Sequence, residues 1–231
     1  MECLFISNLQ ENTSEFVLTE SESKHTKSLR LGIDDDILVT NGIGMTALCR
    51  LTGLSKNGNT VKCIEFYHNL NELECEITLA TGILENHDRF EILIEKAVEL
   101  GVKEIVPLIT QRSSDKPVRY ERATAKIIAA LKQSKRSIMP EFSEAVQLSF
   151  LYDNFNLWDK VILADENGSN SINISGAKKI LILCGPEGGF SDEELSIIDK
   201  ADNLQKIKLA GSRLRSETAA IAALSVVVFN I

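Results

Sequence analysis

Three segments of the chain carry residues suited to holding a ligand, and each follows directly on an apolar run. They read CGPEGGF (residues 184–190), LAGSRLRSETA (209–219) and TQRSSDK (110–116). Paired glycines allow backbone N–H groups to approach a ligand without interference from a Cβ atom. Taken alone, the first segment could be only a tight turn. It lacks the Lys-Ser/Thr of a phosphate-binding P-loop and the GxGxxG spacing of a dinucleotide site.

The second and third segments add arginines. Ser216 and Thr218 are suited to capping a helix that begins here, and Glu217 would favour the positive end of that helix. These roles explain the start of a helix but not the arginines in front of it. Arginine keeps its charge and offers a planar fork of donors to oxygen atoms. Arg112 and Arg215 are therefore candidates for stabilising negative charge on a substrate.

The elements that must position these segments change in kind along the chain. Short apolar runs separated by turn signals such as NGIG and KNGN predict a small β-barrel or sandwich over residues 1–70. From residue 74 onward, strand and helix patterns alternate, which indicates an α/β domain over 74–231 with a mainly parallel sheet. The expected strands are 74–83, 102–110, 159–165, 178–184 and 205–210, and the expected helices are 90–101, 121–135, 191–201 and 216–229.

In a parallel α/β sheet, ligands bind beyond the carboxyl ends of the strands. All three polar segments follow expected strands of the second domain. We therefore expect them to converge at one edge of its sheet and to form one site. The segment at 191–194 also begins with Ser191 and has Glu194 three residues later, which predicts a capping box at the start of its helix.

The composition is that of an ordinary soluble globular protein, with 44% hydrophobic and 25% charged residues. No apolar run approaches the roughly 20 residues that cross a bilayer, and the first residues do not resemble a secretory signal. Five scattered cysteines form no CxxC pair, and His68 and His87 lack partners at metal spacing, so we expect neither a disulfide framework nor a metal site. These features favour a reduced, cytoplasmic protein.

The net charge of −8 disfavours nucleic acid as a partner at first sight, but the charge is unevenly distributed. Between residues 112 and 136, eight basic residues face only Asp115 and Glu121. A concentrated field of one sign can steer a polyanion despite a negative total charge. The alternative is a solvated helix face. The basic residues are Arg112, Lys116, Arg119, Arg122, Lys126, Lys132, Lys135 and Arg136.

Taken together, several segments resemble the ribosomal RNA small-subunit methyltransferase E family, which belongs to the SPOUT class of knotted methyltransferases. The resemblance rests on ILVTNGIG, HDRFEILIEKAVELGVKEIVPLITQRSSDK, ALKQSKRSIMP, CGPEGGFSDEE and LAGSRLRSETAAIAAL, in this order. It implies a PUA-like, RNA-binding N-terminal β-barrel and a SPOUT-type α/β domain with a C-terminal trefoil knot. It also implies a homodimer that uses S-adenosylmethionine to methylate N3 of one uridine in small-subunit (16S) ribosomal RNA.

The resemblance also assigns roles to residues. Arg112 and Arg215 would stabilise the uracil anion that forms when N3–H ionises, and Glu217 or solvent would take the proton, although Glu217 could be only a helix-terminal charge. The expected cofactor-binding residues are Leu183, Gly185, Pro186, Glu187, Gly188, Gly189, Leu209, Ala210, Leu214, Thr218, Ala219 and, more weakly, Glu166. The expected RNA-binding residues are His25, Arg30, Arg119, Arg122 and Arg136, with a structural histidine as the alternative for His25.

Two positions depart from the family pattern. Ala210 stands where glycine is commoner, and Asp34-Asp35 stands where Gly-Asp is usual. Two other classes of function remain open. One is a SPOUT methyltransferase that acts on tRNA or on a ribose 2′-hydroxyl, and the other is a non-catalytic RNA-binding module.

Overall fold

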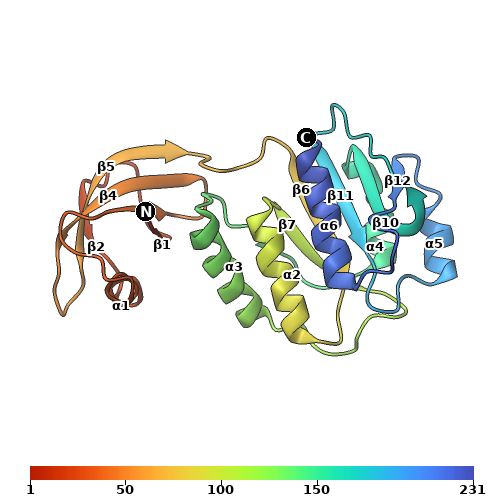
Figure 1. Cartoon of the computed structure of the whole chain (residues 1–231), viewed down its shortest axis with the longest axis horizontal. Coiled ribbons are helices and arrows are strands. Elements are labelled where there is room, and N and C mark those ends of the chain that lie inside the picture. The colour runs from red at the N-terminus through yellow and green to blue at the C-terminus, as the bar shows by residue number, and fades with distance from the viewer. The chain divides into compact units, whose positions relative to one another are not determined.

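The computed structural model describes residues 1–231 and divides into two compact units (Figure 1). Unit 1 comprises Met1–Glu72 and Ile128–Met139, and unit 2 comprises Leu73–Ile127 and Pro140–Ile231. Helix α3, Tyr120–Ser134, therefore contributes to both units. No pattern in the sequence indicated that residues 128–139 join the N-terminal unit.

Unit 1 is built on a curled five-stranded sheet in the order β1-β3-β4-β5-β2. Its long antiparallel strands β4 and β5 pair with two register shifts, which increase the local twist. Leu4, Ile37 and Leu51 are among the residues that fill its core. The strands are β1 Cys3–Phe5, β2 Glu15–Val17, β3 Asp36–Thr40, β4 Met45–Gly53 and β5 Thr60–His68, and the helix α1 is Glu20–Ser28.

Two buried ion pairs bind residues 128–139 into unit 1. The Glu72 carboxylate accepts hydrogen bonds from Arg136 Nη2 (2.6 Å) and from the backbone N–H groups of Ser137 and Ile138 (2.8 Å each). Lys132 Nζ lies 2.8 Å from a carboxylate oxygen of Glu22. Because these charges are removed from water, each pair depends on both partners being present.

Unit 2 contains a seven-stranded sheet whose paired strands are all parallel, as the alternating pattern predicted. The order is β12-β10-β11-β6-β7-β8, and β9 pairs with β7. The strands are β6 Glu76–Gly82, β7 Glu104–Ile109, β8 Glu141–Phe142, β9 Val146–Gln147, β10 Lys160–Ser169, β11 Lys179–Cys184 and β12 Leu204–Ile207.

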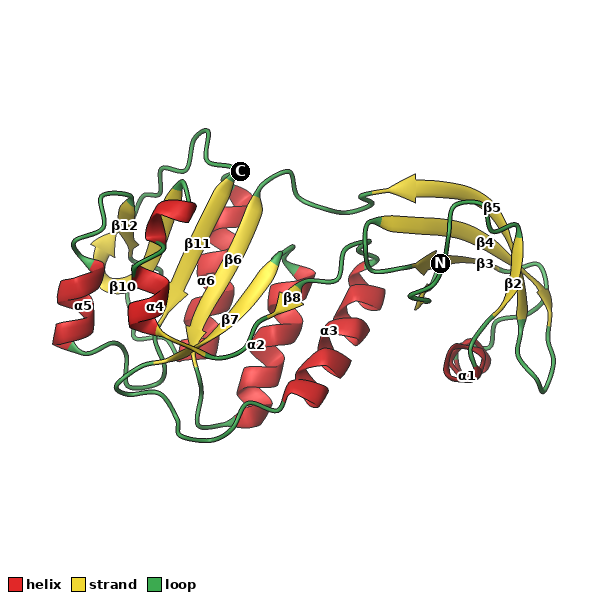
Figure 2. Cartoon of the chain, turned by 180° about the vertical axis from the view of Figure 1, so that it is seen from behind, coloured by secondary structure: helices red, strands yellow, loops and turns green.

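Helices cover both faces of this sheet. Helices α2 (His87–Glu99) and α6 (Ser216–Phe229) lie on one face, and α4 (Leu148–Tyr152) and α5 (Asp192–Ile198) lie on the other (Figures 1 and 2). A short 3₁₀ helix, Phe155–Leu157, follows α4. The predicted capping box at Ser191 and Glu194 is present, and it fixes the start of α5 directly after the glycine-rich segment. None of the helices is both long and apolar enough to cross a bilayer.

The start of α6 differs from the expectation. The residue at its N-cap is Arg215, whose side chain makes no capping hydrogen bond. The Ser216 hydroxyl, expected to cap the helix, donates instead to the carbonyl of Gly185. The prediction of a Ser216 cap was therefore wrong, because the hydroxyl joins the second polar segment to the first.

Candidate active site

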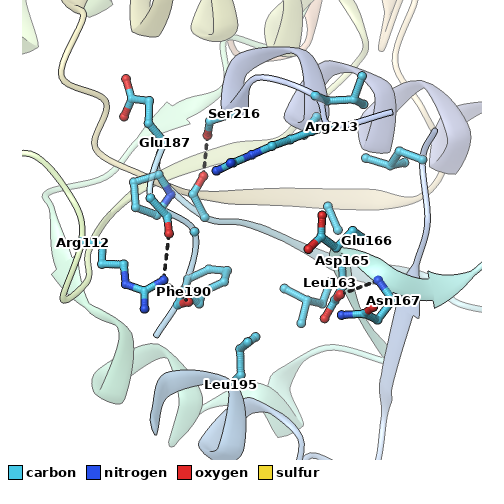
Figure 3. Close-up of a pocket in the computed structure, with 18 of the residues that line it drawn as sticks. Arg112, Leu163, Asp165, Glu166, Asn167, Glu187, Phe190, Leu195, Arg213 and Ser216 are labelled. Carbon is cyan, nitrogen blue, oxygen red and sulfur yellow. Dashed lines mark hydrogen bonds between the residues drawn. The ribbon is translucent and has the colours of Figure 1, made fainter. Parts of the chain in front are cut away.

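A cavity of about 460 Å³ opens at the carboxyl ends of β10, β11 and β12 in unit 2 (Figure 3). Its walls are formed by residues 163–167, 185–190, 209–210, 212–214 and 216, together with Arg112, Leu195 and Ala219. The position at the carboxyl edge of the parallel sheet is the one expected for a ligand site. The three polar segments therefore converge as the sequence indicated, and the third contributes Arg112.

The glycine-rich loop between β11 and α5 is a tight turn that a side chain from another segment, Arg112, fixes by hydrogen bonds. The N–H of Gly189 donates to the carbonyl of Pro186 (2.9 Å), and Gly189 adopts a φ of +68°, a left-handed conformation that favours glycine. Arg112 Nη1 donates to the carbonyls of Gly188 (3.0 Å) and Phe190 (3.2 Å). The arginine thus fixes two carbonyl groups of the loop, and its guanidinium holds the loop in place.

The base of the loop rests on the end of strand β6. A Cβ atom on Gly82 would overlap the ring of Pro186, so the close approach of the loop requires glycine at this position. The Glu187 carboxylate accepts from the backbone N–H of Glu85, with oxygen–nitrogen distances of 3.1 and 3.3 Å. Neighbouring β6 and the residues after it therefore define where the glycine-rich loop lies.

The charges around the cavity are separated in space. Asp165 and Glu166, from the end of β10, gather on one side of the view, whereas Arg112 and Arg213 approach from other directions (Figure 3). Lys206 Nζ lies 3.7 Å from Asp165, which is mostly buried. A wall with two carboxylates suits a ligand that carries positive charge.

Cys184, the residue immediately before Gly185, does not take part as a nucleophile. The thiol is fully buried, and removal from water raises its pKa to about 12. Only the thiolate is strongly nucleophilic, so this cysteine is inert packing beneath the loop. The chain contains no group of three or more His, Cys, Asp or Glu side chains arranged to hold a metal ion.

Most of the residues expected to bind a cofactor line the cavity. Leu183 is buried within β11, and Thr218 is exposed on α6, and neither contributes to the walls. Those that do are Glu166, Gly185, Pro186, Glu187, Gly188, Gly189, Leu209, Ala210, Leu214 and Ala219.

The three expected catalytic residues have different environments. Arg112 lines the cavity, whereas Arg215 is exposed at the start of α6 and is not part of the lining. Glu217 is mostly buried, and its Oε1 lies 3.7 Å from Nε of Arg89 on α2. Its other oxygen is buried without a hydrogen-bond partner.

Sequence reasoning missed several wall residues. Asp165 and Asn167 lie at the end of β10, which extends to Ser169 and not to residue 165 as expected. Arg213 is exposed and lines the cavity. The sequence shows two arginines in one loop, but it does not indicate which of them turns towards the site.

The expected RNA-binding residues have different environments within their own units. His25 is half-buried in the last turn of α1, and Arg30 is exposed just after that helix, with a φ of 59°. Arg119 and Arg122 are exposed, and Arg122 pairs with Glu91. Arg136 is buried against Glu72, with a side chain only 3% exposed. The expectation that Arg136 binds RNA does not fit this position, because the side chain completes the interior of unit 1.

Comparison with known proteins defines the class. Residues 71–228 match the RNA methyltransferase domain, and residues 18–62 match the RNA methyltransferase PUA domain. The fold and the cavity at the strand ends are thus those of an RNA methyltransferase with an N-terminal PUA domain. The chain belongs to the ribosomal RNA small subunit methyltransferase E family, as its relatives show.

Several curated relatives carry that name. The one from Rickettsia conorii is 30% identical over 224 residues, which cover 95% of this chain and 91% of the relative. The one from Mesomycoplasma hyopneumoniae is 31% identical and covers 94% of both. A crystal structure of ribosomal RNA small subunit methyltransferase E from Neisseria gonorrhoeae, bound to S-adenosylmethionine, is 25% identical with a TM-score of 0.88. The match covers 100% of this chain and 98% of that structure.

Proposed function

We propose that this protein transfers a methyl group from S-adenosylmethionine to N3 of one uridine in small-subunit (16S) ribosomal RNA. The observation that carries the proposal is the cavity at the ends of β10, β11 and β12, in a chain of this family. The homologous structure from Neisseria gonorrhoeae binds S-adenosylmethionine. The protein is thus an rRNA methyltransferase that depends on this cofactor.

The walls of the cavity fit the cofactor chemically. The volume lies within the range of small-molecule sites. Leu209 and Leu214 offer apolar contact for an adenine ring, and Asp165 and Glu166 offer negative charge to the cationic amine and sulfonium. A Cβ atom placed on Gly189 would meet nothing within 4 Å, so the backbone there is open towards a ligand.

The protein's task is mainly to align the target base and to favour loss of its proton. When bound, S-adenosylmethionine supplies a methyl group on a sulfonium, so that the N3–C bond forms as the S–C bond breaks. The N3 proton passes to solvent, because Glu217 is mostly buried beside Arg89. Arg112 acts through the loop that it holds, and Arg215 contacts the target strand beside the cavity.

Three further features belong to the proposal. A C-terminal trefoil knot of the SPOUT class is one of them, supported by the family match over residues 71–228. The N-terminal unit is a PUA-like barrel that binds RNA, supported by the family match over residues 18–62. The chain acts as a homodimer. It acts in the cytoplasm, where its ribosomal substrate is found and where its five free thiols stay reduced.

The experiment that tests the proposal is nucleoside mass spectrometry of small-subunit rRNA from cells with and without the gene. Loss of N3-methyluridine on deletion is the expected result, and N3 methylation also stops reverse transcriptase because N3 lies on the Watson–Crick edge. Calorimetry with S-adenosylmethionine provides the second measurement. Loss of a methylated tRNA nucleoside or of a 2′-O-methyl group on deletion would contradict the proposed target. Absence of binding heat with S-adenosylmethionine would contradict the proposal that the protein is an enzyme.

A further inference from the structure

Two arginine side chains line the cavity, and they differ in what they contact. Arg112 is engaged, because its Nη1 donates to the carbonyls of Gly188 and Phe190. Arg213 lies in the exposed loop before α6 and makes no hydrogen bond or ion pair with another side chain. A cation that faces a ligand cavity without a protein partner is available to the ligand.

The surroundings of Arg213 leave its charge uncompensated. Its side chain extends across the cavity in the direction of Glu187 and Ser216 (Figure 3). The Glu187 carboxylate already accepts from the N–H of Glu85, and the Ser216 hydroxyl already donates to Gly185. Lys206 is the cation next to Asp165, so the acidic wall does not need Arg213.

We propose that Arg213, and not Arg215, is the catalytic arginine that stabilises the negative charge on the oxygens of the target uracil as N3 loses its proton. This inference rests on the proposed function. The positive groups of the cofactor match the acidic wall at Asp165 and Glu166, so the exposed arginine is available to a group that carries or develops negative charge. Its planar fork suits a carbonyl oxygen that becomes negative. Arg215 does not line the cavity.

The test compares Arg213→Gln with Lys208→Gln. Lys208 is an exposed cation five positions earlier in the chain and does not line the cavity, so its replacement removes the same charge from the same stretch. We expect Arg213→Gln to lose roughly 10²-fold or more in turnover, as happens when a donor to a developing oxyanion is removed. The affinity for S-adenosylmethionine, measured by calorimetry, should remain unchanged in both variants, and Lys208→Gln should retain full turnover.

The pH profile distinguishes this role from a structural one. Without Arg213 the uracil anion forms less readily, so the variant's rate should continue to rise at alkaline pH where the wild-type rate has levelled. Arg213→Lys should recover part of the turnover, since it restores the charge without the fork. A parallel loss of cofactor affinity would overturn the inference and would assign Arg213 to the cofactor carboxylate. If Arg213→Gln turns over as fast as the wild type, the role of Arg213 is refuted. The proposed function would still stand in that case, provided that the wild-type protein forms N3-methyluridine.

Discussion

Most of the basic residues between 112 and 136 form ion pairs with carboxylates. Lys116, Lys126 and Lys132 contact Glu85, Glu95 and Glu22. Arg122 and Arg136 contact Glu91 and Glu72. The clustered charge that predicted a phosphate-binding surface therefore serves largely to join elements distant in sequence. Arg119 is exposed without such a partner and remains the better candidate for a phosphate contact.

At Arg136 this arrangement predicts a loss of stability, not of RNA contacts. Arg136→Gln leaves the Glu72 carboxylate buried without its cation, and breaking such a pair costs about 3–5 kcal/mol of unfolding free energy. Urea unfolding followed by circular dichroism measures the change. The matched control is Arg119→Gln, an exposed arginine whose replacement should alter stability by less than about 0.5 kcal/mol. An unchanged unfolding curve for Arg136→Gln would contradict the buried pair.

Arg119 carries a prediction of its own. Arg119→Gln should weaken binding of small-subunit rRNA and reduce the salt dependence of binding by about one phosphate contact. Filter binding at several salt concentrations measures the slope. Lys178→Gln, an exposed cation just before β11 and at the opposite end of that strand from the cavity, serves as the charge-matched control. If the salt dependence of RNA binding has the same slope for Arg119→Gln and the wild type, Arg119 makes no phosphate contact, and the basic stretch 112–136 is only a solvent-exposed surface.

Burial also determines the behaviour of the thiols. Desolvation raises the pKa of Cys3 and Cys184 from an ordinary value of 9.0 to about 12. Between pH 9 and pH 12 the folded protein therefore keeps these thiol protons, whereas the unfolded chain has lost them. The contribution of the two thiols to the free energy of unfolding is complete below pH 9 and is lost as the pH rises towards 12. Urea unfolding at pH 8 and pH 10 should show lower stability at pH 10. Cys184→Ala should reduce that difference, and an equal difference in the variant would refute the assignment.

At the scale of elements, the sheet of unit 2 depends on close contacts beneath the glycine-rich loop. Gly82→Ala places a methyl group against Pro186 and should displace the loop. We expect at least a tenfold loss of S-adenosylmethionine affinity, about 1.4 kcal/mol, measured by calorimetry. Gly32→Ala in unit 1 is the control, because a Cβ there makes only an ordinary contact with Asp35 at 3.9 Å. Wild-type affinity in Gly82→Ala would show that the loop tolerates the shift.

Elements with a strong apolar pattern were predictable from the sequence. The final helix was expected at 216–229 and lies at Ser216–Phe229, and every central strand of unit 2 was found within a few residues. Helix α1, with the sequence ESESKHTKS, was missed because it is polar and buries only Glu22 and Thr26. The short strands β8 and β9 were missed as well, since two residues carry no periodicity.

The site was predictable in its loops but not in its side-chain directions. Sequence spacing brought the three polar segments together, because the carboxyl ends of parallel strands share one edge. Whether Arg213 or Arg215 faces the cavity depends on the backbone path into α6, which no pattern of residue types reveals. The same limit applies at Asp34, where the family pattern has glycine. This aspartate adopts a left-handed φ of 72°, which explains the preference for glycine there.

At the scale of the whole molecule, the outer side and the C-terminal end of α6 are apolar, and no other element of the chain covers them. Phe229 is 89% exposed, and Ile221 is partly exposed on the same helix. A helix that is apolar nearly all round needs cover on more than one side. A second copy of the chain, proposed above, would supply that cover.

The oligomeric state can be checked directly. Light scattering should give twice the chain mass of 25.6 kDa for the wild type, and Ile221→Asp with Phe229→Asp should give a monomer. Phe150→Asp is the control, because Phe150 is 64% exposed on α4, on the opposite face of the sheet. A monomeric wild type at micromolar concentration would refute the dimer.

Helix α3 has a consequence for how the protein is made and inherited. Unit 1 takes the cation for Glu72 from Arg136, a residue 64 positions later in the chain. While the chain emerges from the ribosome, the first 72 residues must therefore wait, with Glu22 and Glu72 unpaired, until residue 139 has been synthesised. A gene fragment that ends at residue 72 likewise encodes an unfinished domain. Recombination at a single junction cannot move unit 1 on its own, because residues 73–127 of unit 2 lie between its two segments, so the two units are expected to have evolved together.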